Sequence, residues 1–265
     1  MKIQYASDLH LEFPENKKFL LENPLIPVGD ILVLAGDIVP FAILDKHKDF
    51  FNFLSDHFAE TFWVPGNHEY YKSDIAKWDG KVHDSIMPNV HIVNNTTITI
   101  MDVRLIFSTM WSNINSSNQW QIEHSVSDFF QIKNNGFRFS AKAFNQKHTE
   151  SLSFLKRELS LYVPNTVVVT HHVPTLMNYP EQYKGDVLND AFAAEISDFI
   201  RESRVNAWIF GHHHVNVGAF TIGNTAMVTN QMGYVRYGEQ DGFNTNANII
   251  IDSGDNQNNK VIFAQ

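Results

Sequence analysis

The sequence ILVLAGD at residues 31–37 consists of five apolar residues followed by a glycine and a carboxylate. An uninterrupted apolar run of this kind predicts a β-strand that is buried on both faces. Val167–Thr170 and Ala207–Phe210 are similar runs, and stretches with helical spacing of apolar residues separate such runs along the chain. Alternating strands and helices predict an α/β fold.

Helices are expected in Phe41–Glu60, in Ser140–Leu161 with Ser140 as the N-cap, and in Asn189–Arg201. The chain then ends in short strands, two of which flank the hairpin signal Gly223-Asn224. This order predicts two packed sheets within the α/β fold. Because no repeat or linker interrupts the sequence, we expect a single domain over residues 1–265.

Residues 112–136 differ in character from the rest of the chain. They are rich in Asn, Ser and Gln, with Trp120 embedded among them. A polar stretch of this length is typical of a functional loop, so we expect a cap or substrate loop over residues 112–136. In this interpretation the loop faces the substrate, and trimming it would leave the metal content of the protein intact.

The composition excludes several classes of protein. The formal charge of −9 argues against a protein that coats long nucleic acid or lies on anionic lipid. The absence of cysteine excludes disulfides, thiolate metal sites and a cysteine nucleophile. The N-terminus does not resemble a signal peptide, and no apolar run approaches the ~18 residues needed to span a bilayer. We therefore expect a cytoplasmic protein without membrane contact.

Metal-ligating side chains follow five predicted strands, each at the point where the strand ends. Carboxyl ends of neighbouring strands converge at one edge of an open α/β sheet, so these side chains should meet there. Their types, Asp, His and Asn, suit Mn, Fe or Zn ions. The candidates are too numerous for one ion and about right for two ions that share a carboxylate. They are Asp8, His10, Asp37, Asn67, His171, His212 and His214.

These segments resemble the five motifs of the calcineurin-like metallophosphoesterases, which read D-x-H, GD, GNH[ED], H and GHxH. All five are present in order between Asp8 and His214. The resemblance implies a four-layer α/β/β/α sandwich of two mixed sheets flanked by helices. It also implies that Asp8, His10 and His214 bind one metal ion. Asn67, His171 and His212 would then bind the other, with Asp37 bridging both ions.

The resemblance also assigns two residues beside the ligand Asn67. His68 matches the histidine that contacts the scissile phosphate and can protonate the leaving oxygen, and Glu69 matches a position that orients this histidine. Softer similarities to a bacterial, uncharacterised subgroup, together with side-chain type, suggest substrate contacts. These candidates are Trp111, Tyr183 and Arg236.

The sequence therefore predicts a dinuclear metal-dependent phosphoesterase that acts on a small phosphoester by in-line attack of a metal-bound hydroxide. Two alternatives remain open: a cyclic-nucleotide phosphodiesterase or nuclease, and a non-catalytic binding scaffold on the same fold. A scaffold would be expected to lose ligands or the histidine that protonates the leaving group, and this chain keeps them all. The physiological substrate, the native metal pair and the oligomeric state are left open.

Overall fold

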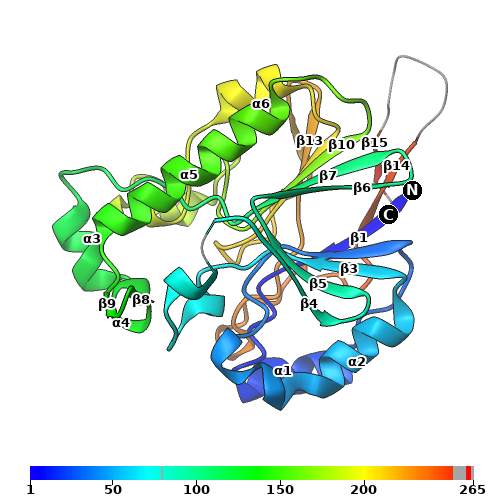
Figure 1. Ribbon diagram of the computed structural model, residues 1–265, viewed down its shortest axis with the longest axis horizontal. Coiled ribbons are helices and arrows are strands. Elements are labelled where there is room, and N and C mark those ends of the chain that lie inside the picture. The colour runs from blue at the N-terminus through cyan, green and yellow to red at the C-terminus, as the bar shows by residue number, and fades with distance from the viewer. Residues whose placement is uncertain (79, 253–260, 264–265) are drawn as a thin grey trace.

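The computed structural model describes residues 1–78, 80–252 and 261–263. Two β-sheets lie face to face, with helices on both outer sides (Figure 1). From edge to edge, the first sheet contains β15 (Val261–Phe263), β14 (Asn248–Ile251), β1 (Lys2–Ala6), β2 (Ile31–Leu34), β3 (Glu60–Trp63), β5 (Val90–Asn94) and β4 (Val82–Met87). The second contains β12 (Phe220–Ile222), β13 (Thr225–Thr229), β11 (Ala207–Phe210), β10 (Thr166–Thr170), β7 (Val103–Ser108) and β6 (Thr96–Ile100).

Helices cover the outer face of each sheet. α1 (Pro14–Glu22) and α2 (Lys48–His57) lie on the first sheet, and α5 (Ala141–Leu159) and α6 (Ser197–Ser203) lie on the second (Figure 1). Among the described residues the 3₁₀ helices are η1 (Phe41–His47), η2 (His68–Tyr70), η3 (Ile75–Trp78), η4 (Glu181–Tyr183), η5 (Val187–Ala191) and η6 (Val235–Tyr237). The expected four-layer α/β/β/α arrangement is confirmed.

The alternation of side chains along each strand builds these layers. In β2, Ile31 and Val33 enter the core between the two sheets, whereas Leu32 and Leu34 enter the core beneath α1 and α2. In β11, Ile209 points into the central core while its neighbours pack under α5 and α6. Successive residues of a strand face opposite sides, so an unbroken apolar run supplies both layers at once.

The strand directions bring the functional motifs together. β1, β2, β3 and β5 are parallel neighbours in the first sheet, and β7, β10, β11 and β13 are parallel neighbours in the second. The carboxyl ends of each parallel set therefore lie at one edge of its sheet. Every metal-ligating segment predicted from the sequence follows one of these ends.

Two expected helices differ from the structure and one is confirmed. Ser140 caps α5, accepting a hydrogen bond from the backbone of Ala143. The expected helix at 41–60 is divided into η1 and α2. The expected helix at 189–201 is wrong, because the backbone of residues 192–194 pairs with Val173 as a β-bridge and α6 starts only at Ser197.

The 112–136 segment is not an open loop. It contains α3 (Gln119–Ser125), α4 (Asp128–Gln131) and β8 (Lys133–Asn134), which pairs with β9 (Phe137–Arg138). Its buried side chains Ile122 and Phe129 share a small separate core with residues of η3 and α5. Trp120, by contrast, is 74% exposed and stacks on His124. None of the helices in the described part of the chain is both long and apolar enough to cross a bilayer.

Candidate metal centre

Seven predicted ligands come together beyond the carboxyl ends of five parallel strands, three in the first sheet and two in the second. Asp8, His10, Asp37 and His214 place one ligand atom each within 4.8 Å of one another, and so do Asp37, His171 and His212. Asn67 joins the second group through its Oδ1 atom, which lies 3.1 Å from His171 Nε2. Asp37 belongs to both groups.

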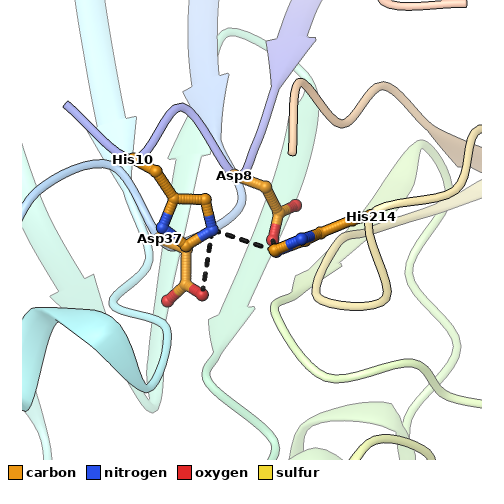
Figure 2. A group of neighbouring side chains, drawn as sticks. All are labelled: Asp8, His10, Asp37 and His214. Atoms are coloured by element: carbon orange, nitrogen blue, oxygen red, sulfur yellow. Dashed lines mark hydrogen bonds and ion pairs between the residues drawn. The ribbon is translucent and has the colours of Figure 1, made fainter. Parts of the chain in front are cut away.

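In the first group, imidazole nitrogens and carboxylate oxygens point toward one another (Figure 2). The Nε2 atoms of His10 and His214 lie 2.9 Å apart. His10 Nε2 is also 3.7 Å from Asp37 Oδ2, and His214 Nε2 is 3.5 Å from Asp8 Oδ1. All four side chains are largely buried. Lone-pair-bearing atoms that converge in a buried space suit a bound cation.

The second group uses the other oxygen of the shared carboxylate. Asp37 Oδ1 lies 3.4 Å from His171 Nε2, whereas Oδ2 faces the first group. The buried His212 has no hydrogen-bond partner for its Nδ1 atom. An orphaned buried nitrogen of this kind is costly unless it has a ligand. The residues present therefore fit two metal ions with Asp37 between them.

Hydrogen bonds at the far side of the imidazoles fix which nitrogen faces the centre. Nδ1 of His171 lies 2.8 Å from the Ala35 carbonyl oxygen, and Nδ1 of His214 lies 2.7 Å from Glu239 Oε2. Such partners hold the ring orientation and leave the Nε2 lone pair free for a metal ion. The same Nε2 atoms are the ones that approach Asp37 and Asp8.

The backbone at the ligands is held in a conformation that non-glycine residues rarely adopt. Asp8 and Asp37 both have φ of 55°, and His212 has φ of 85°. Strain of this kind persists where the surrounding structure enforces it and is concentrated at functional sites. Beside the ligands, a Cβ atom at Gly66 would collide with Asp37 Oδ1 and His171 Nε2. The glycine of the GNH motif is therefore required by the close approach of the two groups.

The buried carboxylates of the centre favour positive charge on the groups beside them. Burial alone would lower the pKa of His171, but the carboxylates of Asp37 and Asp8 raise it to about 9. Burial would also lower the pKa of His214, but Asp8 and Glu239 raise it to about 10. In the metal-free protein, protons on these rings offset the buried carboxylates. A metal ion can supply the same compensation, in exchange for those protons.

His68 lies beside the two groups without joining either set of predicted ligands. Its Nδ1 is 2.8 Å from Glu12 Oε1, and its Nε2 is 3.2 Å from the Tyr234 hydroxyl. The ring of Tyr71 stacks on it with centroids 4.0 Å apart. Burial would lower the pKa of His68, but the carboxylates of Asp37 and Glu12 raise it above its ordinary value. The imidazole is therefore held in place and favoured in its protonated form.

The hydrogen-bond partners of Glu69 differ from the expected one, His68. The buried Glu69 carboxylate accepts hydrogen bonds from the backbone N–H groups of Asp37, Ile38, Val39 and Gly66. These bonds join the loop after β2 to the loop after β3, so Glu69 acts on the backbone that carries the ligands. The carboxylate at His68 belongs to Glu12 instead.

Both groups open into a cavity of about 800 Å³. Its walls include Tyr183, whose substrate contact stays a prediction, together with Asp128 of the 112–136 segment. Trp111 is not among the lining residues, since it is 2% exposed and packs against Phe139 and Phe144. Arg236 is also absent from the lining and lies over the ring of Tyr237. The structure therefore places Trp111 in a core rather than at the cavity wall, whereas a substrate contact of Arg236 stays a prediction.

Glu12, Asp128 and Glu239 are functional-site residues that the sequence interpretation missed. A sequence signal existed for Glu12, because it is a third ligand-type residue spaced two positions after Asp8 and His10. Asp128 and Glu239 reach the centre from distant segments through tertiary packing. No local pattern marks them.

Comparisons with known proteins agree with this geometry. Residues 1–216 match the family described as calcineurin-like phosphoesterase. The uncharacterized protein L509 of Acanthamoeba polyphaga mimivirus is 32% identical over 277 aligned positions, which cover 94% of this chain and 96% of that protein. The crystal structure of the phosphopantetheinyl hydrolase from Mycobacterium tuberculosis is similar in fold, with a TM-score of 0.70 and 15% identity over 95% of this chain and 96% of that one. The chain thus belongs to the calcineurin-like phosphoesterase family and carries two buried groups of metal-ligating side chains.

Proposed function

We propose that this protein is a dinuclear metal-dependent phosphodiesterase that hydrolyses a small organic phosphodiester. The observation that carries the proposal is the shared carboxylate: the two oxygens of Asp37 face two separate ligand groups at one end of a large cavity. Asp8, His10 and His214 would hold one ion, and Asn67, His171 and His212 the other. Manganese, iron and zinc all suit these ligands.

The chemistry divides between the ions and the side chains. Two bound metal ions would activate water and neutralise charge on the phosphoryl oxygens. His68 would donate the proton at Nε2 to the departing oxygen, because its Nδ1 is held by Glu12. Tyr71 and Tyr234 contact the His68 ring and restrict its orientation. The chain's own residues thereby set the position of the acid before substrate arrives.

The charge of the cavity favours a diester over a monoester. Among the described residues that line it, the lysines are Lys46 and Lys72, both exposed, and there is no arginine. Carboxylates of Glu12, Asp186 and Glu239 also line it. A dianionic monoester needs more positive charge around its free oxygens than a monoanionic diester does. The same balance disfavours the long backbone of a nucleic acid.

A phosphoester panel on protein reconstituted with Mn²⁺ tests the proposal. We expect hydrolysis of bis(p-nitrophenyl) phosphate to exceed hydrolysis of p-nitrophenyl phosphate. Cyclic nucleotides and a phosphopantetheine diester belong in the panel, the latter because of the name of the structurally similar hydrolase. A preference for the monoester would contradict the diester assignment. A protein that binds metal and hydrolyses nothing in the panel would favour the scaffold alternative.

A further inference from the structure

Asp128 is a buried carboxylate supplied to the metal centre by the 112–136 segment. It is the first residue of α4 and is 1% exposed. Its Oδ1 atom accepts a hydrogen bond of 2.8 Å from Asn67 Nδ2 and another of 2.8 Å from the Tyr71 hydroxyl. Burying a carboxylate costs several kcal/mol unless hydrogen bonds compensate it, so its two partners indicate what it does there.

The bond to Asn67 decides which end of that amide faces the metal centre. An asparagine side chain has a donating NH₂ and an accepting oxygen, and only the oxygen can ligate a cation. Because the Asn67 Nδ2 group donates a hydrogen bond to Asp128, Oδ1 is directed toward His171 Nε2, 3.1 Å away. A flipped amide would place its oxygen against the Asp128 carboxylate, which offers no proton when ionised. Asp128 therefore selects the ligating orientation.

The second bond extends the effect to His68. The Tyr71 hydroxyl donates a hydrogen bond to the same Asp128 oxygen as Asn67 does. The Tyr71 ring stacks on the His68 ring, with 4.0 Å between the centroids and an interplanar angle of 26°. One carboxylate thus restrains both a predicted metal ligand and the ring that packs on the candidate acid. Neither restraint comes from the sheets.

The 112–136 segment is anchored so that α4 can hold this position. Phe129, beside Asp128, is fully buried and packs on Phe139 and Phe144. The carbonyl of Gln131 accepts a hydrogen bond from the backbone N–H of Lys72, one residue after Tyr71. The segment is therefore fastened both to its own small core and to the loop that follows the GNHE motif.

We infer that Asp128 is a positioning residue that sets the Asn67 amide for the second metal ion, so that the 112–136 segment completes the metal centre as well as lining the cavity. This inference rests on the proposed metal centre. It revises the expectation that trimming the segment would leave the metal content intact.

Metal affinity, measured by chelator competition with Mn²⁺ alone, tests the inference. Loss of an outer hydrogen-bond partner typically weakens metal binding roughly 10–100-fold. We expect Asp128→Ala to weaken the second site by this amount while the first site is unchanged. Asp128→Asn keeps a neutral acceptor and should have a smaller effect. Trp120→Ala, at an exposed position in the same segment, is the matched control and should bind both ions normally.

A double-mutant cycle separates positioning from general damage to the fold. Once Asn67→Ala has removed the amide, adding Asp128→Ala should cause little further loss of metal affinity. The inference would be overturned if the losses of metal affinity in Asn67→Ala and Asp128→Ala were additive in the double variant. It would also be overturned if Asp128→Asn and Asp128→Ala both bound the second metal ion as tightly as wild type. If Asp128→Ala fails to fold, judged by thermal unfolding of the metal-free protein, Asp128→Asn alone decides through the same affinity comparison. A wild-type protein that binds fewer than two ions would instead contradict the proposed function.

Discussion

The Nδ1 atom of His68 lies 2.8 Å from the Oε1 atom of Glu12, although 55 residues separate the two in the sequence. Glu12 Oε1 also lies 3.2 Å from Nδ1 of His10, a predicted metal ligand. A single carboxylate thus links the first ligand group to the candidate acid. Since this link occupies Nδ1, Nε2 is the nitrogen that can face a leaving oxygen, in place of its 3.2 Å contact with the Tyr234 hydroxyl.

Removing the acid should affect substrates according to their leaving groups. We expect His68→Ala to keep both metal ions and to lose ~10²–10⁴-fold in kcat/KM on an alkyl phosphodiester, with far less loss on a p-nitrophenyl ester. Glu12→Gln should show the same trend more weakly, and Glu15→Gln, at an exposed position nearby, should show none. The measurement is kcat/KM against leaving-group pKa, beside metal content. Equal losses on every substrate would argue against proton donation by His68.

Glu69 is expected to matter for stability rather than for the leaving group. Glu69→Gln replaces one acceptor oxygen with an NH₂ group that faces buried backbone N–H donors. The free energy of unfolding of the metal-free protein should fall by about 1–3 kcal/mol, because buried N–H donors lose their acceptor. Glu202→Gln, an exposed position on α6, is the control. Unchanged stability by denaturant titration, together with a leaving-group-dependent loss of activity, would return Glu69 to the role expected from the sequence.

Trp111 and Tyr183 should behave in opposite ways. Trp111 is buried among aromatic rings, so Trp111→Ala should cost about 3–5 kcal/mol of stability. The milder Trp111→Phe should leave KM unchanged. Tyr183 lines the cavity, so Tyr183→Ala should raise KM for the best diester in the panel. A KM shift in Trp111→Phe without loss of thermal stability would show that Trp111 contacts substrate after all.

Glu195 provides a pH-dependent contribution to stability away from the centre. Its carboxylate accepts hydrogen bonds from the backbone N–H groups of Leu176 and Ser197. Partial burial would raise the pKa of Glu195, but these hydrogen bonds lower it below its ordinary value of 4.5. A lowered folded-state pKa stabilises the fold above the ordinary pKa, and this stabilisation is lost as pH falls through the lowered value. Glu195→Gln should therefore destabilise the metal-free protein at pH 7, with a difference that shrinks at strongly acidic pH. A constant difference in unfolding free energy would contradict this.

The strands and the ligands could be predicted because local pattern determines both. The run at 31–35 has apolar side chains for two cores, and Gly36 and Asp37, which follow, end the strand at the convergent edge of the sheet. A ligand immediately after such a strand has little freedom in where it lies. The structure consequently brings the seven predicted ligands of the five motifs together, and their binding of metal stays a prediction.

The residues that support the ligands could not be predicted in the same way. Asp128 reaches Asn67 only because the 112–136 segment folds on a core of its own, which a polar composition did not indicate. Trp111 was misjudged because the sequence does not distinguish an aromatic residue that packs in a core from one that faces a cavity. The role of Glu69 was expected from the family resemblance alone, which does not reveal that its carboxylate accepts hydrogen bonds from backbone N–H groups.

Metal stoichiometry of wild type and Asp37→Asn, compared side by side, tests the central claim most directly. Both proteins would be reconstituted with Mn²⁺, dialysed and analysed for metal per chain, with a check of folding by circular dichroism. Because the two oxygens of Asp37 face different ligand groups, we predict two ions per chain in wild type and weakened binding of both in the variant. Retention of two ions by folded Asp37→Asn, or a single ion in wild type, would contradict a centre built around a shared carboxylate.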